Sequence, residues 1–195
     1  MTILIPGTNW EASGGWIPAS NGYRGLLQYG EQLGGPTQLL AWSPSRNRHA
    51  DRLAAAHSLV DLIAAHTFAP GEQLHIIAHS HGGNVVLAAS RLGLPRPVDL
   101  FIALNKPTLR SAAYRPGPGI ARFFNISAAR DWIQRLGARF VLGSCFDPHA
   151  INHVVDTRTS LLRPHAALIW DDDCRDLWWQ WLQRQRGVET LFTGF

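Results

Sequence analysis

A serine with small neighbours lies where an apolar strand is expected to turn into a helix. Residues 73–91 read QLHIIAHSHGGNVVLAASR. The first apolar run predicts a strand, and the small, helix-favouring residues after the glycine pair predict a helix. Ser80 lies between the two, with Ala78 two residues before it and Gly82 two residues after it. This pattern is typical of a nucleophile elbow, a strained turn without room for large flanking side chains. Ser80 is therefore a candidate nucleophile.

Such a turn would expose the Ser80 hydroxyl above the edge of the sheet. It would also direct the backbone N–H of His81 towards a substrate oxygen, with the positive end of the helix dipole behind it. The Ser-x-Gly pattern alone is common, so the alternative is a glycine-rich turn with an incidental serine. The expected strand before Ser80 and the expected helix after it favour the elbow.

The Ala-His-Ser-x-Gly pattern at 78–82 resembles the elbow of the α/β-hydrolase family, and most of all that of its small, lidless bacterial lipases and esterases. Ala78 replaces the leading glycine that the family usually carries there. The resemblance extends over most of the 195 residues, which we expect to form one domain, 1–195. It implies a compact α/β fold in which a six-stranded sheet holds the elbow near its centre.

Six apolar runs along the chain predict strands, and helical patterns lie between most of them. The expected strands are 2–5, 37–42, 74–78, 98–104, 121–127 and 151–156. Alternating strands and helices predict a mostly parallel sheet covered on both faces. The resemblance implies the spatial strand order 2-1-3-4-5-6.

The resemblance assigns two further residues to a catalytic triad. Asp131 follows the strand 121–127, where the family carries the triad acid; the alternative is that it caps a short helix through Leu136. His165 lies in the expected loop between the last strand and a last helix at about 171–185, where the family carries the triad histidine. The alternative is a surface histidine. The chain order Ser80, Asp131, His165 is that of the family.

The chain has nine histidines, so the choice of His165 needs an argument. His149 precedes the last strand and therefore lies at the wrong end of the sheet. His153 lies within that strand, where its side chain faces a sheet surface. Three others lie on the nucleophile strand or directly beside the serine, where they are badly placed to act as its base: His75, His79 and His81.

The loop after the first strand is expected to supply a second oxyanion donor beside the His81 amide. It reads Pro6-Gly7-Thr8, which resembles the family's loop without its usual His-Gly pair, and Thr8 is the residue placed to donate. The alternative is a plain strand-ending turn. Residues 11–36 are expected to shape a substrate cleft, which Trp10 and Trp16 would line.

Composition excludes several function classes. The chain has 18 Lys+Arg against 14 Asp+Glu, but the arginines are scattered, so we expect no nucleic-acid partner. A weak attraction to anionic lipid, and thus peripheral membrane contact, is compatible with this charge. Cys145 and Cys174 lack the C-x-x-C spacing of metal or redox sites, so we expect no metal and no cofactor. Whether they pair is left open.

The beginning of the chain lacks the charged and apolar regions of a secretory signal. We therefore expect a cytoplasmic protein by default, with signal-independent export as the alternative. Oligomeric state is open, and so is whether the chain is a module of a longer protein.

Taken with the resemblance, these residues predict a serine hydrolase that cleaves carboxylic esters through a Ser-His-Asp triad and an acyl-enzyme. A lipase or esterase is favoured, with phospholipase as a narrower option. A thioesterase or amidase would use the same triad. A protein of this fold that binds without turnover is the alternative from another class.

Overall fold

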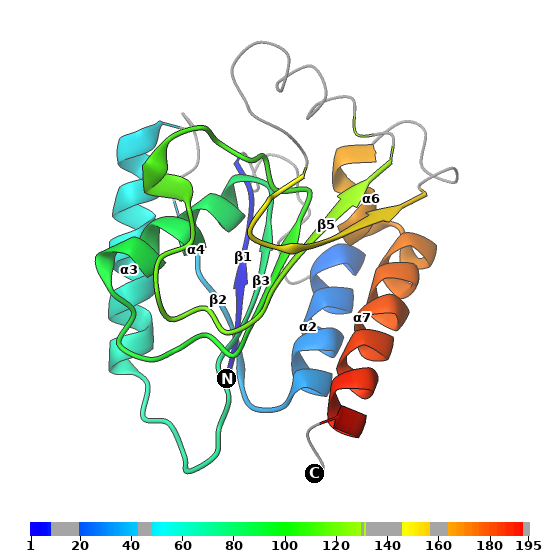
Figure 1. The fold of residues 1–195 in the computed structure, drawn as a ribbon, viewed down its shortest axis with the longest axis horizontal. Coiled ribbons are helices and arrows are strands. Elements are labelled where there is room, and N and C mark those ends of the chain that lie inside the picture. The colour runs from blue at the N-terminus through cyan, green and yellow to red at the C-terminus, as the bar shows by residue number, and fades with distance from the viewer. Residues whose placement is uncertain (9–19, 43–47, 130, 132–145, 157–163, 193–195) are drawn as a thin grey trace.

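The computed structural model describes residues 1–8, 20–42, 48–129, 131, 146–156 and 164–192. Its centre is a sheet of six strands, all of them parallel (Figure 1). The spatial order is β2-β1-β3-β4-β5-β6, which confirms the predicted order. The strands are β1 (Thr2–Ile5), β2 (Thr37–Leu39), β3 (His75–His79), β4 (Leu100–Leu104), β5 (Phe123–Ala128) and β6 (Ile151–Val155).

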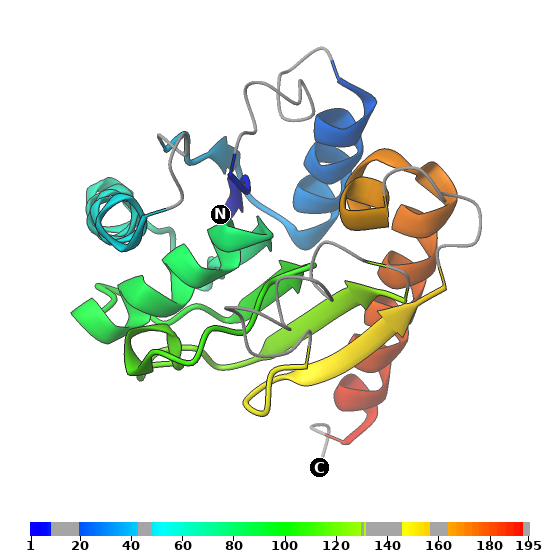
Figure 2. The same ribbon diagram turned by 90° about the horizontal axis from the view of Figure 1, so that it is seen from above.

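Helices cover both faces of this sheet (Figure 2). On one face lie α3 (His49–Ala65) and α4 (His81–Leu92), and on the other lie α2 (Asn21–Leu33), α6 (Pro164–Trp170) and α7 (Asp172–Phe192). A short 3₁₀ turn, η1 (Ala112–Tyr114), follows β4. The expectation of a parallel α/β sheet between two helical layers is confirmed.

Alternation along the central strands explains the two cores. Ile76 of β3 packs in the core under α3 and α4, and its neighbour Ile77 packs in the core under α2, α6 and α7. Because neighbouring side chains of a strand point to opposite faces, a strand covered on both sides must be apolar throughout. β4 (LFIAL) meets this demand throughout, whereas β1 and β3 are equally buried but carry Thr2, His75 and His79 at their ends.

Several expected boundaries differ from those observed. β2 ends at Leu39 rather than at residue 42, and β4 begins at Leu100 rather than at residue 98. α7 continues beyond residue 185 to Phe192. The short helix expected through Leu136 lies outside the described residues, as do Trp10, Trp16 and Cys145.

Parallel strands bring their carboxyl ends to one edge, and this edge positions the candidate site. β3 ends directly before Ser80, β1 ends directly before the loop that carries Thr8, and β5 ends three residues before Asp131. Residues distant in the sequence therefore meet without long connections across the sheet. Among the described helices, none is both long and apolar enough to cross a membrane.

Candidate active site

Ser80 occupies a strained turn between β3 and α4. Its backbone has φ 50° and ψ −129°, a conformation that residues other than glycine rarely adopt. A backbone held this way costs of the order of 1–3 kcal/mol and persists only where the surroundings enforce it. Here the Ser80 N–H donates to the Leu104 carbonyl at 2.8 Å, which ties the turn to the end of β4. The turn therefore has the geometry predicted for a nucleophile elbow.

The small residues around Ser80 are required by close packing. A Cβ at Gly82 would lie 2.7 Å from the Ile5 carbonyl oxygen and 2.5 Å from that of Pro6. Backbone cannot yield as a flexible side chain can, so glycine alone fits where α4 begins. Ala78 is fully buried beside Ile5 in the sheet, where its methyl group is accommodated. Alanine in place of the family's leading glycine is thus compatible with this turn.

Ser80, His165 and Asp131 form one hydrogen-bonded chain. The His165 Nε2 lies 3.1 Å from the Ser80 Oγ, and the His165 Nδ1 lies 2.6 Å from the Asp131 Oδ2. A carboxylate can only accept, so Nδ1 carries the proton. Nε2 is then left with a lone pair that accepts the Ser80 hydroxyl proton. This is the tautomer that a general base for Ser80 needs.

Burial strengthens the contact between the acid and the base. Asp131 is 1% exposed, and the His165 side chain is 19% exposed. A carboxylate removed from water interacts strongly with an imidazolium, because the local dielectric is low. Asp131 is further held at the end of β5 by its N–H, which donates to the Ala128 carbonyl at 3.2 Å.

The expectation that His165 lies in a loop is wrong. It is the second residue of the seven-residue helix α6, which leads into α7. α6 is anchored from α7 by the Trp178 Nε1, which donates to the Leu168 carbonyl at 2.9 Å. Pro164 opens this helix, since proline lacks the N–H that a first helical residue does not need. The imidazole is therefore presented by a packed element rather than by a free loop.

The loop after β1 lies against the elbow, as the expected oxyanion site requires. A Cβ at Gly7 would lie 2.8 Å from the Ser80 Cβ, so the chain at this glycine touches the serine directly. Thr8 follows and is half-buried. His81 is the first residue of α4, and the N–H of a first helical residue has no partner within its helix. One candidate donor, His81, adjoins Ser80 in the chain, and the other, Thr8, follows the glycine that touches Ser80.

His79 and His81, which flank Ser80 in the chain, are both buried. Burial lowers the pKa of His79 to about 3 and, together with the Arg52 charge, lowers that of His81 to about 3. Both rings are therefore neutral near pH 7. His153 is stacked on the Trp181 ring with centroids 4.1 Å apart, so it faces the sheet surface as expected.

Two residues near the site have contacts with His165 that were not predicted from the sequence. The Asn105 Nδ2 and the His79 Nε2 both contact the His165 carbonyl oxygen. Asn105 follows β4 directly, and its residue type alone gave no signal of a role in the site. Its backbone φ of 49° could not be read from the sequence. His79 was considered only as a candidate base for Ser80, not as a hydrogen-bond partner of His165.

In the described part of the chain, no group of three or more His, Cys, Asp or Glu side chains is arranged to hold a metal ion. Comparison with protein-family models finds none that matches the chain, and comparison with curated proteins finds no similar sequence. The geometry of the site therefore carries the functional inference.

Proposed function

We propose that this chain is a serine hydrolase of the α/β-hydrolase family that cleaves carboxylic esters, with lipase or esterase activity. The observation that carries the proposal is the hydrogen-bonded chain from the Ser80 Oγ through His165 to Asp131. The strained φ of Ser80 and its position before the amino end of α4 support it. The six-stranded parallel sheet in the order 2-1-3-4-5-6 agrees with the family's architecture.

Acylation begins when the Ser80 Oγ attacks the ester carbonyl carbon and passes its proton to the His165 Nε2. The carbonyl electron pair moves to oxygen, and the amides of Thr8 and His81 stabilise the resulting oxyanion. When the tetrahedral intermediate collapses, the bond to the alcohol breaks, and the His165 Nε2–H protonates the leaving oxygen. Asp131 stabilises the imidazolium throughout.

Deacylation repeats these steps with water. The His165 Nε2 takes a proton from the water as its oxygen attacks the acyl carbon. The second tetrahedral intermediate expels the Ser80 oxygen, which regains its proton from His165, and the carboxylic acid leaves. The chain's own residues therefore supply every proton transfer that the reaction needs.

A panel of p-nitrophenyl esters of increasing acyl length, with phospholipids beside it, tests the proposal. We expect wild-type protein to hydrolyse the esters and Ser80→Ala to lose nearly all activity, by about 10⁴-fold or more, while remaining folded. Ser90→Ala is a matched control, because Ser90 is a buried serine of α4 that bonds the Leu87 carbonyl instead.

Equal hydrolysis by wild type and Ser80→Ala would overturn the assignment. A wild-type protein that is folded but cleaves none of the esters would leave two readings. Turnover of thioesters or amides alone would show a different substrate class for the same triad. Inertness towards all of these together would favour a binding module without turnover.

A further inference from the structure

The backbone carbonyl oxygen of His165 receives two side-chain donors from different strands. The Asn105 Nδ2 lies 2.7 Å from this oxygen, and the His79 Nε2 lies 3.0 Å from it. Asn105 follows the end of β4, and His79 is the last residue of β3. The residue that presents the imidazole is thus bound to the carboxyl ends of two central strands.

Asn105 uses both ends of its amide. Its Oδ1 accepts the N–H of Ala128 at 2.7 Å, while its Nδ2 donates to His165. The partners determine the orientation of the amide, because an N–H must meet the oxygen and a carbonyl must meet the nitrogen. Ala128 ends β5, and its carbonyl accepts the N–H of Asp131. Asn105 therefore connects the strand that leads to the acid with the helix that carries the base.

The backbone of Asn105 has a conformation that ordinary loop residues avoid. Its φ is 49°, its exposure is 0%, and its N–H donates to the Ile126 carbonyl at 2.8 Å. Asparagine tolerates this left-handed region better than most residues. A buried amide in this region is costly unless its polar atoms are bonded. Both features agree with a residue placed there for its two side-chain contacts.

His79 is suited to donate without carrying charge. A carbonyl only accepts, so the His79 Nε2 must carry a proton. Burial first, and then the charge of His165, lower the pKa of His79 to about 3, so its ring is neutral near pH 7. The His79 and His165 ring centroids are 4.9 Å apart. A neutral ring at this separation can hold His165 without repelling the imidazolium formed during acylation.

We propose that Asn105 and His79 are positioning residues that hold the His165 imidazole between Ser80 and Asp131 by binding its backbone carbonyl together. Restraining the backbone of His165 restrains the direction of its Cα–Cβ bond and hence the place of the ring. The catalytic part of this inference rests on the proposed hydrolase function. The positional part concerns the His165 geometry and has a readout of its own.

Substitutions that keep size but remove a donor test the two contacts with the His165 carbonyl. Asn105→Asp retains an oxygen for the Ala128 N–H and places a second oxygen against the His165 carbonyl. His79→Phe keeps a ring and removes the donor, whereas His79→Gln offers an amide N–H in its place. A displacement of about 1 Å at a reacting group can cost about 10²-fold. We expect kcat to fall by about 10- to 100-fold in N105D and H79F, with KM little changed, and to recover largely in H79Q.

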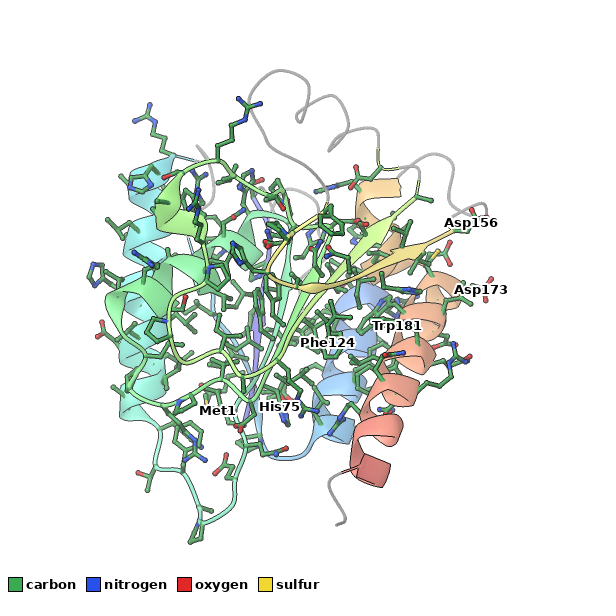
Figure 3. All side chains as sticks on the ribbon, in the orientation of Figure 1. Met1, His75, Phe124, Asp156, Asp173 and Trp181 are labelled. Carbon is green, nitrogen blue, oxygen red and sulfur yellow. The ribbon has the colours of Figure 1, made fainter. Side chains whose placement is uncertain are left out.

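His75→Phe is the matched control. His75 is a buried histidine of the same strand, four residues before His79, and burial lowers its pKa to about 4. It lies beside Met1 at the opposite end of the sheet, where its N–H donates to the Met1 carbonyl (Figure 3). H75F should therefore alter stability without altering kcat.

A second measurement is independent of turnover. The proton that His165 Nδ1 shares with Asp131 should give a low-field imidazole resonance in the proton NMR spectrum. We expect this resonance to shift or broaden in N105D and H79F and to persist in H79Q and H75F. If N105D does not fold, the H79F and H79Q pair decides. A wild type without turnover would refute the hydrolase function, and the resonance would still test whether Asn105 and His79 position the His165 ring.

Unchanged kcat and an unchanged low-field resonance in folded N105D and H79F would overturn the inference. Loss of kcat in H79F that H79Q does not restore would also contradict it, because the donor would then not be the property that matters. Equal losses of kcat in H79F and H75F would indicate a general packing effect instead.

Discussion

At the residue scale, the site depends on which nitrogen of one imidazole carries a proton. The 2.6 Å contact between the His165 Nδ1 and Asp131 places the proton on that nitrogen and leaves Nε2 free for Ser80. A neutral imidazole has one proton for two nitrogens, so a change at Asp131 can change whether Nε2 accepts the Ser80 proton. In the proposed mechanism the acid therefore matters although it does not touch the serine.

Asp131→Asn tests this dependence. The amide can donate to the His165 Nδ1, which favours the tautomer with the proton on Nε2, and such a histidine cannot accept the serine proton. The same change in a comparable triad lowers kcat by about 10⁴-fold. We expect a similar loss in ester hydrolysis with the unfolding transition nearly unchanged. A kcat within about tenfold of wild type would show that Asp131 does not orient the base.

At the element scale, the carboxyl end of β4 is held from two sides. Asn105 contacts the ends of β5 and α6, and the next residue, Lys106, forms an ion pair with Asp147 at 2.9 Å. Lys106 is the only lysine of the chain and is 1% exposed. Burial lowers its pKa, and Asp147 opposes that shift. The pair binds the segment before β6 to the strand next to the elbow.

Removing one partner of this pair should be costly. Asp147→Asn leaves the Lys106 ammonium buried without its counter-charge, and breaking a buried pair in this way costs about 3–5 kcal/mol. Lys106→Met together with Asp147→Asn removes both charges and should cost less than the sum of the single changes. Denaturant unfolding of the three variants completes the cycle. Additive costs would show that the two charges do not interact.

Asp172→Asn is the matched control for this cycle. Asp172 pairs with Arg175 three residues later on α7, but its side chain is 75% exposed. Arg175 is buried but also donates to the Ile169 carbonyl, and water screens the exposed Asp172 carboxylate, so we expect the pair to contribute about 1 kcal/mol or less. The same chemical change should therefore be nearly silent at 172 and severe at 147. Comparable costs at the two positions would contradict the role given to burial.

The elements around Ser80 could be predicted because each leaves a local signature. The apolar run of β3, the small residues of the turn and the helix formers of α4 adjoin in the sequence, and six such apolar runs predicted the strands. Their spatial order was predicted from the family resemblance. α6 was missed because seven residues are too few for a helical period to show. Contacts such as that between Asn105 and His165, 60 positions apart, depend on tertiary packing and have no local signature.

At the scale of the whole molecule, buried histidines make stability depend on pH. The folded pKa values of His75, His79 and His81 are about 4, 3 and 3, against an ordinary value of 6.5, and burial is the largest cause for each. Between the folded pKa and the ordinary pKa, each of these histidines binds a proton in the unfolded chain but not in the folded chain. The free energy of unfolding therefore falls as pH falls below about 7.

Urea unfolding between pH 7 and pH 5 checks this dependence. Each proton bound only by the unfolded chain contributes a slope approaching about 1.4 kcal/mol per pH unit. This range lies above the window of Glu72, whose pKa falls from 4.5 to about 2 mainly through the Ala69 N–H. We expect stability to decline towards pH 5, and His75→Phe to make the decline shallower. A flat profile in wild type would contradict the burial of these rings as neutral groups.

Activation of Ser80 is tested most directly by reaction of the folded protein with a fluorophosphonate, followed by mass mapping of the adduct. The Ser80 Oγ would form a bond to phosphorus as fluoride leaves, which requires a serine activated by its neighbours. We expect one adduct per chain on Ser80, absent in Ser80→Ala and formed far more slowly in His165→Gln. A folded wild type that stays unlabelled, or that labels elsewhere at the same rate without Ser80, would contradict it.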